Sequence, residues 1–149
     1  MSLLPQSFPP ASGERRHWGP LPDASAALAI AEAAREAKRP LLLITRDSAS
    51  AMRLQSELKF FAKPLSIELL PDWETLAYDN FSPHQDIISD RLRVLASLPD
   101  MKHGVLIAPV STVLQRLAPA ERIQGNSFNL AVGDSLDLVA MQERLTAAG

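Results

Sequence analysis

Leu41-Leu42-Leu43-Ile44 and Val105-Leu106-Ile107-Ala108 are the two stretches that decide the fold of this 149-residue chain. Each is short and continuously apolar, and each follows a residue that interrupts regular structure, Pro40 in one case and Gly104 in the other. Such runs suit strands that are buried on both faces, as in parallel sheets. Leu65–Leu70 is a further strand candidate that lies between them in the chain.

Helices are predicted between these strands. Ala24–Lys38 is rich in alanine, and Asp23 or Ser25 can cap it. The next predicted helix has one apolar face, because helical spacing brings together Ala51, Leu54, Leu58 and Phe61. Strand and helix therefore alternate, which implies right-handed crossovers. The predicted fold class is α/β, with a parallel sheet that carries helices on both faces.

A third helix is predicted to start in Ser82-Pro83-His84-Gln85. Ser82 is a capping residue, Pro83 suits the first helical position, and Gln85 can close a capping box. We expect this helix to bury Ile88, Leu92 and Leu95. A short fourth helix, Val110–Leu117, follows the last strand and ends before Pro119.

Composition excludes several classes of protein. The formal net charge is −2, which disfavours a chain that grips nucleic acid by bulk electrostatics. The chain has no cysteine, which excludes disulfides and thiolate metal sites. No apolar stretch has membrane-spanning length, and the N-terminus lacks the pattern of a secretion signal. We therefore expect a soluble, cytoplasmic protein without a membrane partner.

Three regions are predicted along the chain. Residues 1–14 are rich in proline and read as a flexible arm. Residues 15–126 form the α/β domain, which ends in the polar cluster Gln124–Ser127. Residues 127–149 hold a predicted strand, Phe128–Val132, and a helix that Asp137 can cap. We interpret this last region as the start of a second, truncated domain, whose apolar faces must be covered by a neighbouring molecule or fray.

Gly19–Ala26 has the length of a phosphate-binding loop but lacks its chemistry. Such a loop needs Gly-x-x-x-x-Gly-Lys-Ser/Thr, in which amides and lysine hold phosphate and the hydroxyl holds magnesium. Gly19 fills the first position, while Ala24, Ser25 and Ala26 replace the second glycine, the lysine and the hydroxyl residue. The prolines within the stretch also remove amide donors. We expect neither nucleotide nor metal to bind here.

The centre of the chain resembles the N-terminal module of the bacterial transcription-repair coupling factors. The motif segment that carries this resemblance comprises Asp72, Trp73, Glu74, Tyr78, Asp79, Phe81, Ser82, Pro83, His84, Gln85 and Asp86. Arg91-Leu92, Gly104–Val110 and Gln115-Arg116 extend the match, which covers roughly residues 15–149. In that family the module is similar to the first domain of the damage-verification helicase of excision repair.

The resemblance implies a helicase-like α/β scaffold with a degenerate phosphate loop, and it places that loop at Gly19–Ala26. It implies that this fragment has no catalytic residue and no cofactor, whereas the motor of the parent uses ATP and magnesium. It also implies partners: the rest of the parent chain and, mostly through parts absent here, RNA polymerase, the damage-recognition ATPase and DNA. We expect at most weak DNA binding by this fragment and no tight complex with that ATPase.

The aromatic residues of the motif segment allow two interpretations. Trp73, Tyr78 and Phe81 could stack on the bases of a DNA strand, or they could anchor an ordered loop onto the sheet. We favour anchoring, because the neighbouring carboxylates would repel phosphate. A metal site built from Asp79, His84 and Asp86 is disfavoured, because residues two apart on a helix should diverge.

Two function classes remain. The first is a non-catalytic scaffold fragment at the front of an ATP-dependent DNA translocase that couples transcription to nucleotide excision repair. The alternative is a stand-alone small α/β domain that binds or hydrolyses a nucleotide. The missing lysine and hydroxyl at Ser25 and Ala26 argue against this alternative.

Overall fold

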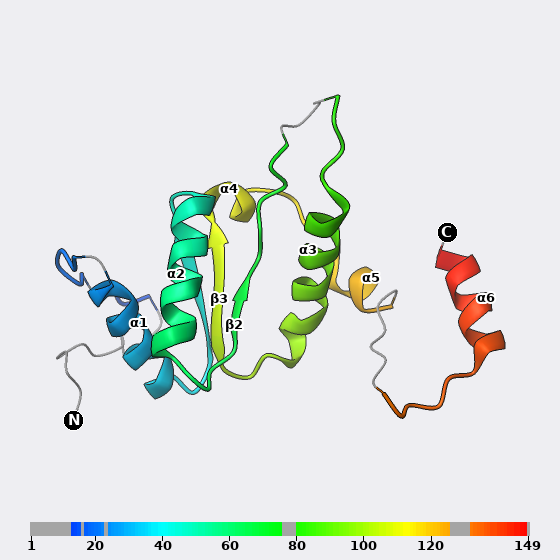
Figure 1. Cartoon of the computed structure of the whole chain (residues 1–149), viewed down its shortest axis with the longest axis horizontal. Coiled ribbons are helices and arrows are strands. Elements are labelled where there is room, and N and C mark those ends of the chain that lie inside the picture. Colours follow the sequence, from blue (N-terminus) through cyan, green and yellow to red (C-terminus); the bar gives the residue numbers. More distant parts are fainter. Residues whose placement is uncertain (1–12, 16, 23, 76–79, 126–131, 149) are drawn as a thin grey trace. The chain divides into compact units, whose positions relative to one another are not determined.

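A computed structural model describes residues 13–15, 17–22, 24–75, 80–125 and 132–148 of the chain. The chain divides into two compact units, Met1–Arg116 and Leu117–Gly149. The first unit contains the sheet, and the second contains two short helices (Figure 1). The sequence predicted that the α/β domain ends at residue 126 and that a second domain begins at residue 127. This division into domains stays a prediction.

The sheet of the first unit has three parallel strands in the order β1-β3-β2. These are β1 (Pro40–Thr45), β2 (Ile67–Leu69) and β3 (Gly104–Pro109), which confirms the three predicted strands. The burial predicted for both faces of the first strand was wrong, because Leu42 and Ile44 of β1 are 57% and 51% exposed. Pro40 pairs with Gly104 at the start of β1, and Ile67 pairs with Val105. The last strand in the sequence, β3, is therefore the central strand of the sheet. After β1 the chain passes over the position of β3 to form β2, and it then returns to form β3 between them.

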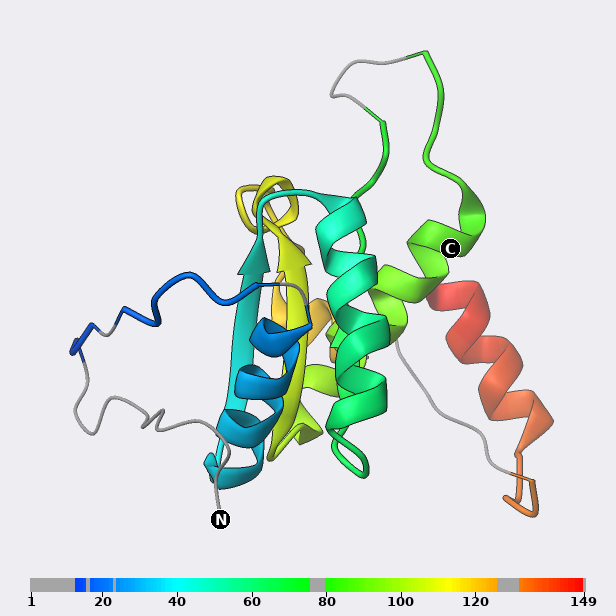
Figure 2. The same cartoon turned by 60° about the vertical axis from the view of Figure 1, so that its left-hand side comes forward.

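Two helices cover one face of the sheet, as Figure 2 shows. They are α1 (Ser25–Glu36) and α2 (Ser48–Phe61). Alanines of α1 and Leu58 of α2 are fully buried, and they form one core cluster with Val105 and Ile107. Because alanine side chains are short, the backbone of α1 can lie close to its neighbours.

The helix α3 (Gln85–Ser97) covers the other face, and a 3-10 turn, η1 (Leu98–Asp100), follows it. Val94 packs there with Leu70 and Ala108. Helices on both faces confirm the predicted α/β class. The predicted buried face of α3 was wrong in part, because Leu92 is 49% exposed while Arg91 is only 2% exposed. The helix is rotated so that Arg91, and not Leu92, faces the domain, while Leu95 packs against the core as predicted.

Helix starts follow local hydrogen bonding. Asp47 caps α2, since its Oδ1 accepts a hydrogen bond from the Ser50 amide at 2.7 Å. The predicted cap of α3 was wrong, because the helix begins only at Gln85 and His84 is the N-cap residue. The Ser25 cap predicted for α1 was wrong as well. Ser25 lies inside that helix, and its hydroxyl donates to the Pro22 carbonyl; Asp23 lies outside the described residues.

The last helix of the first unit is short. It is α4 (Val110–Val113), so the predicted helix ends four residues before Leu117. None of the helices in the described parts of the chain is long and apolar enough to cross a membrane.

The second unit contains α5 (Ala120–Gly125) and α6 (Leu138–Ala148). The predicted Asp137 cap is confirmed, because its Oδ1 accepts from the Val139 and Ala140 amides at 3.0 and 3.1 Å. The predicted strand Phe128–Val132 lies outside the described residues except Val132, which is in a turn. Leu138 and Leu145 of α6 are 73% and 54% exposed. That a neighbouring molecule covers these leucines, or that the segment frays, stays a prediction.

Candidate functional site

The motif segment begins where the chain leaves β2, and Asp72 is its best-connected residue. Its carboxylate accepts hydrogen bonds from the Ser111 hydroxyl at 2.5 Å and the Gln115 side-chain amide at 2.8 Å. It also accepts from the Trp73 backbone amide at 2.8 Å. Ser111 belongs to α4 and Gln115 follows it, so Asp72 ties the exit of β2 to the segment that follows β3.

Arg91 holds the same segment from α3. Its guanidinium carbon lies 4.1 Å from the centre of the Trp73 ring, which is a cation–π contact. The guanidinium also donates a hydrogen bond to the Pro71 carbonyl oxygen. Arg91 is therefore buried for a reason that helical periodicity does not reveal: it binds the chain directly after β2. In the sequence Arg91 extends the motif, but no local pattern marks it as a buried residue.

We call Asp72, Trp73, Arg91, Ser111 and Gln115 the β2-exit cluster. Burial raises the pKa of the Asp72 carboxyl, but hydrogen bonds from Ser111, Gln115 and the Trp73 amide, with the charge of Arg91, outweigh it, so this pKa lies below its ordinary value of 3.8. Burial lowers the pKa of Arg91, and Asp72 partly offsets that effect. Both groups are charged at neutral pH, so the cluster is ionic when the domain is folded.

The depressed pKa of Asp72 predicts an acid dependence of stability. A carboxyl whose pKa is lower in the folded state stabilises the fold above its unfolded pKa, and this contribution is lost as the pH falls through the folded pKa. We expect Asp72→Asn to destabilise the domain at about pH 7 and to cost less at about pH 3. Urea unfolding of both proteins at the two pH values measures this. A cost that is the same at both values would contradict the prediction.

The aromatic residues of the motif do not share one role. Trp73 is partly buried and contacts Arg91 of α3, and the anchoring predicted for it, onto the sheet, stays a prediction. Phe81 is 77% exposed, so the anchoring predicted for it was wrong. Tyr78 and Asp79 lie outside the described residues. Glu74, which follows Trp73, has a φ of 58°, a left-handed conformation that turns the chain at this point.

His84 and Asp86 meet, contrary to the predicted divergence. The His84 Nδ1 atom lies 3.4 Å from an Asp86 carboxylate oxygen, and it accepts a long hydrogen bond from the Asp86 amide at 3.3 Å. The prediction assumed that both residues are helical, whereas His84 precedes α3 and folds back over its first turn. Among the described residues, no group of three or more His, Asp or Glu side chains could hold a metal ion.

The Gly19–Ala26 stretch leads into α1. Gly19 is exposed, and a Cβ atom added there would meet nothing within 4 Å. Ala24, Ser25 and Ala26 are partly buried at the helix start, and the Ser25 hydroxyl is engaged with the Pro22 carbonyl. That this stretch is a degenerate phosphate loop stays a prediction.

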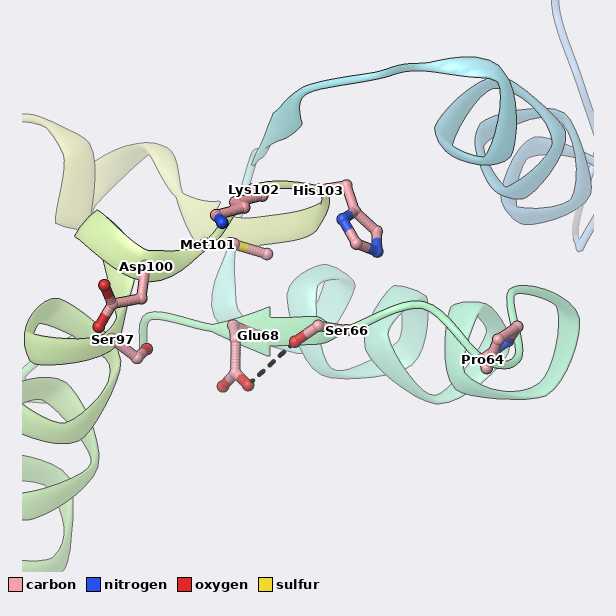
Figure 3. Close-up of a pocket in the computed structure, with 8 residues that line it drawn as sticks. All are labelled: Pro64, Ser66, Glu68, Ser97, Asp100, Met101, Lys102 and His103. Atoms are coloured by element: carbon pink, nitrogen blue, oxygen red, sulfur yellow. Dashed lines mark hydrogen bonds between the residues drawn. The ribbon is translucent and has the colours of Figure 1, made fainter. Parts of the chain in front are cut away.

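A cavity of about 400 Å³ opens at the other end of the sheet, near the starts of β2 and β3 (Figure 3). Its lining mixes both charges with hydroxyl and apolar groups: Pro64, Ser66, Glu68, Ser97, Asp100, Met101, Lys102 and His103. Glu68 is already paired, since one carboxylate oxygen lies 3.0 Å from the Arg93 guanidinium and the other accepts from Ser66 at 3.4 Å. No motif in the sequence pointed to this cavity, and its described lining does not assemble a catalytic constellation.

Together these features define a class of protein. It is a small α/β domain with a parallel sheet, in which the motif segment links the end of β2 to the residues that follow β3. Comparison with known proteins identifies the family. The chain is 42% identical to the transcription-repair-coupling factor of Escherichia coli over 143 residues and 43% identical to that of Haemophilus influenzae over 129 residues. The transcription-repair-coupling factor of Staphylococcus aureus is 27% identical over 120 residues. The chain is thus a member of the transcription-repair-coupling factor family.

The match covers most of this chain but little of each relative. It includes 96% of the chain and 12% of the Escherichia coli protein, and 87% of the chain and 11% of the Haemophilus influenzae protein. The chain therefore corresponds to an N-terminal portion of much larger proteins. No family model matches the chain.

Proposed function

We propose that this chain is a non-catalytic scaffold from the front of an ATP-dependent DNA translocase that couples transcription to nucleotide excision repair. The observation that supports this proposal best is the 42% identity to the Escherichia coli transcription-repair-coupling factor over 96% of the chain. The motor, its ATP and magnesium, and most contacts to RNA polymerase, DNA and the damage-recognition ATPase belong to the parent. The fragment itself contacts the rest of the parent, in the cytoplasm.

The chemistry of the described residues supports a structural role. The charged groups of the β2-exit cluster bind other parts of the chain: the Asp72 carboxylate accepts from Ser111 and Gln115, and the Arg91 guanidinium lies over Trp73 and donates to the Pro71 carbonyl. The Ser25 hydroxyl, at the position where a phosphate loop needs lysine, bonds the Pro22 carbonyl. These residues position chain segments, and the proposal assigns them no chemical step.

A chimera tests this function. The segment of the Escherichia coli relative that matches this chain is replaced by residues 1–149, and repair of the transcribed strand is measured in cells that lack the native factor. We expect the chimera to restore most of the repair that the native protein supports. A chimera that is expressed at native level, hydrolyses ATP and yet fails to restore repair would overturn the proposal.

The proposal predicts that the isolated chain does not bind magnesium-ATP. Ala24, Ser25 and Ala26 lack the groups that hold phosphate and metal, and the nearby prolines remove amide donors. Calorimetric titration is expected to give no heat of binding, both for the native chain and for the triple variant Ala24→Gly, Ser25→Lys, Ala26→Thr. Micromolar binding that Gly19→Val abolishes would favour the stand-alone nucleotide-binding domain instead.

A further inference from the structure

The three connections that lead into the strands lie at one end of the sheet. They are residues 37–39 between α1 and β1, residues 62–66 between α2 and β2, and residues 101–103 between η1 and β3. Because the three strands are parallel, these connections meet at the same end (Figure 1). Neighbouring strands lie about 4.8 Å apart, so the starts of the three strands form a row about 10 Å long.

We call these three connections the basic end of the sheet. They contain four Lys or Arg residues and no Asp or Glu: Lys38, Arg39, Lys63 and Lys102. All four are exposed, and Figure 3 shows Lys102 in the stretch that enters β3. Among the residues that the structure describes, none of the four takes part in an ion pair. The basic end therefore presents four positive charges without a counter-charge of its own.

Negative charge next to the basic end does not cancel this excess. The carboxylates within two residues of it in the sequence are Glu36, Glu68 and Asp100. Three further cations offset them, since Arg93 pairs with Glu68 at 3.0 Å and α1 and α2 each carry a basic residue in the last turn, Arg35 and Lys59. The C-terminus of a helix carries about half a negative charge, so three helix ends remove less than half of the four positive charges.

The opposite end of the sheet has the reverse charge. The described residues of the connections that leave β1 and β2 include Asp47, Asp72 and Glu74, and Arg46 is the only Lys or Arg among them. The net charge of −2 thus hides a separation of charge along the strand direction. A polyanion is attracted to the basic end and repelled from the other end.

We propose that the basic end is a weak, sequence-independent contact surface for the phosphate backbone of double-stranded DNA. Lysine binds phosphate as a point charge, and three of the four cations are lysines. Protein interfaces are depleted in lysine and enriched in aromatic residues, whereas the basic end has no Trp, Tyr or Phe. Its composition therefore disfavours an acidic protein as the partner. It also disfavours single-stranded DNA, whose bases stack on aromatic side chains.

The size of the basic end sets the strength of this contact. The phosphates of one DNA strand repeat every 3.4 Å, roughly, along the helix axis, so a row about 10 Å long faces about three of them. Neutralising about three phosphates gives a slope of about −2.7 when the logarithm of affinity is plotted against the logarithm of salt concentration. Affinity should then fall about 40-fold between about 25 and about 100 mM salt. So small a footprint agrees with the weak DNA binding expected of this fragment.

Fluorescence anisotropy of a labelled DNA duplex, titrated with the 149-residue chain, tests the surface. We expect a dissociation constant of about 10 to 100 µM at about 25 mM salt. The double variant Lys38→Gln, Lys102→Gln should weaken binding by at least about tenfold and reduce the salt slope by about 2. The matched control is Arg46→Gln, Arg53→Gln, which changes the net charge equally and alters side chains that are 86% and 60% exposed outside the basic end. It should change the affinity by less than about twofold.

Unlabelled competitors identify the partner. Duplex DNA should displace the labelled duplex better than single-stranded DNA of the same length or poly-glutamate of equal charge. Three results would each overturn the proposal: no binding at about 300 µM chain and about 25 mM salt, equal weakening by the two double variants, or stronger displacement by single-stranded DNA or poly-glutamate. These experiments measure DNA binding by the isolated chain and not repair, so their failure is distinct from a failure of the chimera.

Discussion

Gly104→Ala is expected to destabilise the domain by at least about 3 kcal/mol. Gly104 starts the central strand with a φ of 123°, a conformation that side chains other than hydrogen rarely allow. A Cβ atom there would lie 2.5 Å from the Ser66 carbonyl oxygen and 2.9 Å from the Met101 methyl carbon. The methionine can move, but the carbonyl cannot, because it accepts a 2.9 Å hydrogen bond from the Val105 amide.

Urea unfolding of the variant measures this cost. Gly19→Ala is the matched control, because a Cβ atom added at Gly19 meets nothing within 4 Å and its φ is not positive. We expect the control to change stability by less than about 0.5 kcal/mol. If the two variants were equally stable, neither the backbone conformation of Gly104 nor its contact with Ser66 would matter to the fold.

Arg91→Ala is expected to cost about 3 to 4 kcal/mol, because it removes a large buried side chain and the positive charge that acts on Asp72. The substitution also removes the cation–π contact with the Trp73 ring and the hydrogen bond to the Pro71 carbonyl oxygen. Arg91→Lys keeps the charge but not the planar group, so we expect a smaller loss of about 1 to 2 kcal/mol. Chemical unfolding, followed by Trp fluorescence, reports both values.

Arg93 on the same helix provides the control. Its side chain is 57% exposed, and it pairs with Glu68 at 3.0 Å and with Asp90 at 3.7 Å. Ion pairs of this kind contribute about 0–1 kcal/mol, so Arg93→Ala should have a small effect. Similar losses for the two alanine variants would show that Arg91 acts as an ordinary surface charge, and the β2-exit cluster would lose its central member.

The strands and their order of appearance follow from the sequence because they depend on short-range features. Leu41–Ile44 and Val105–Ala108 are short apolar runs that follow a proline and a glycine, and strands β1 and β3 contain them. The Asp137 cap could be read in the same way, since the carboxylate bonds amides two and three residues further on. The motif residues from Asp72 to Asp86 likewise sufficed to identify the family.

The tertiary structure alone decided which charged residues are structural. Helical periodicity favoured Leu92 as a core residue, but Arg91 is buried, because its partners Trp73 and Pro71 are about twenty positions away in the chain. Asp72 likewise meets Ser111 and Gln115, which are 39 and 43 positions away. The position of β3 at the centre of the sheet, between β1 and β2, also depends on the tertiary structure. Contacts of this range depend on how the whole chain packs, and no local pattern contains them.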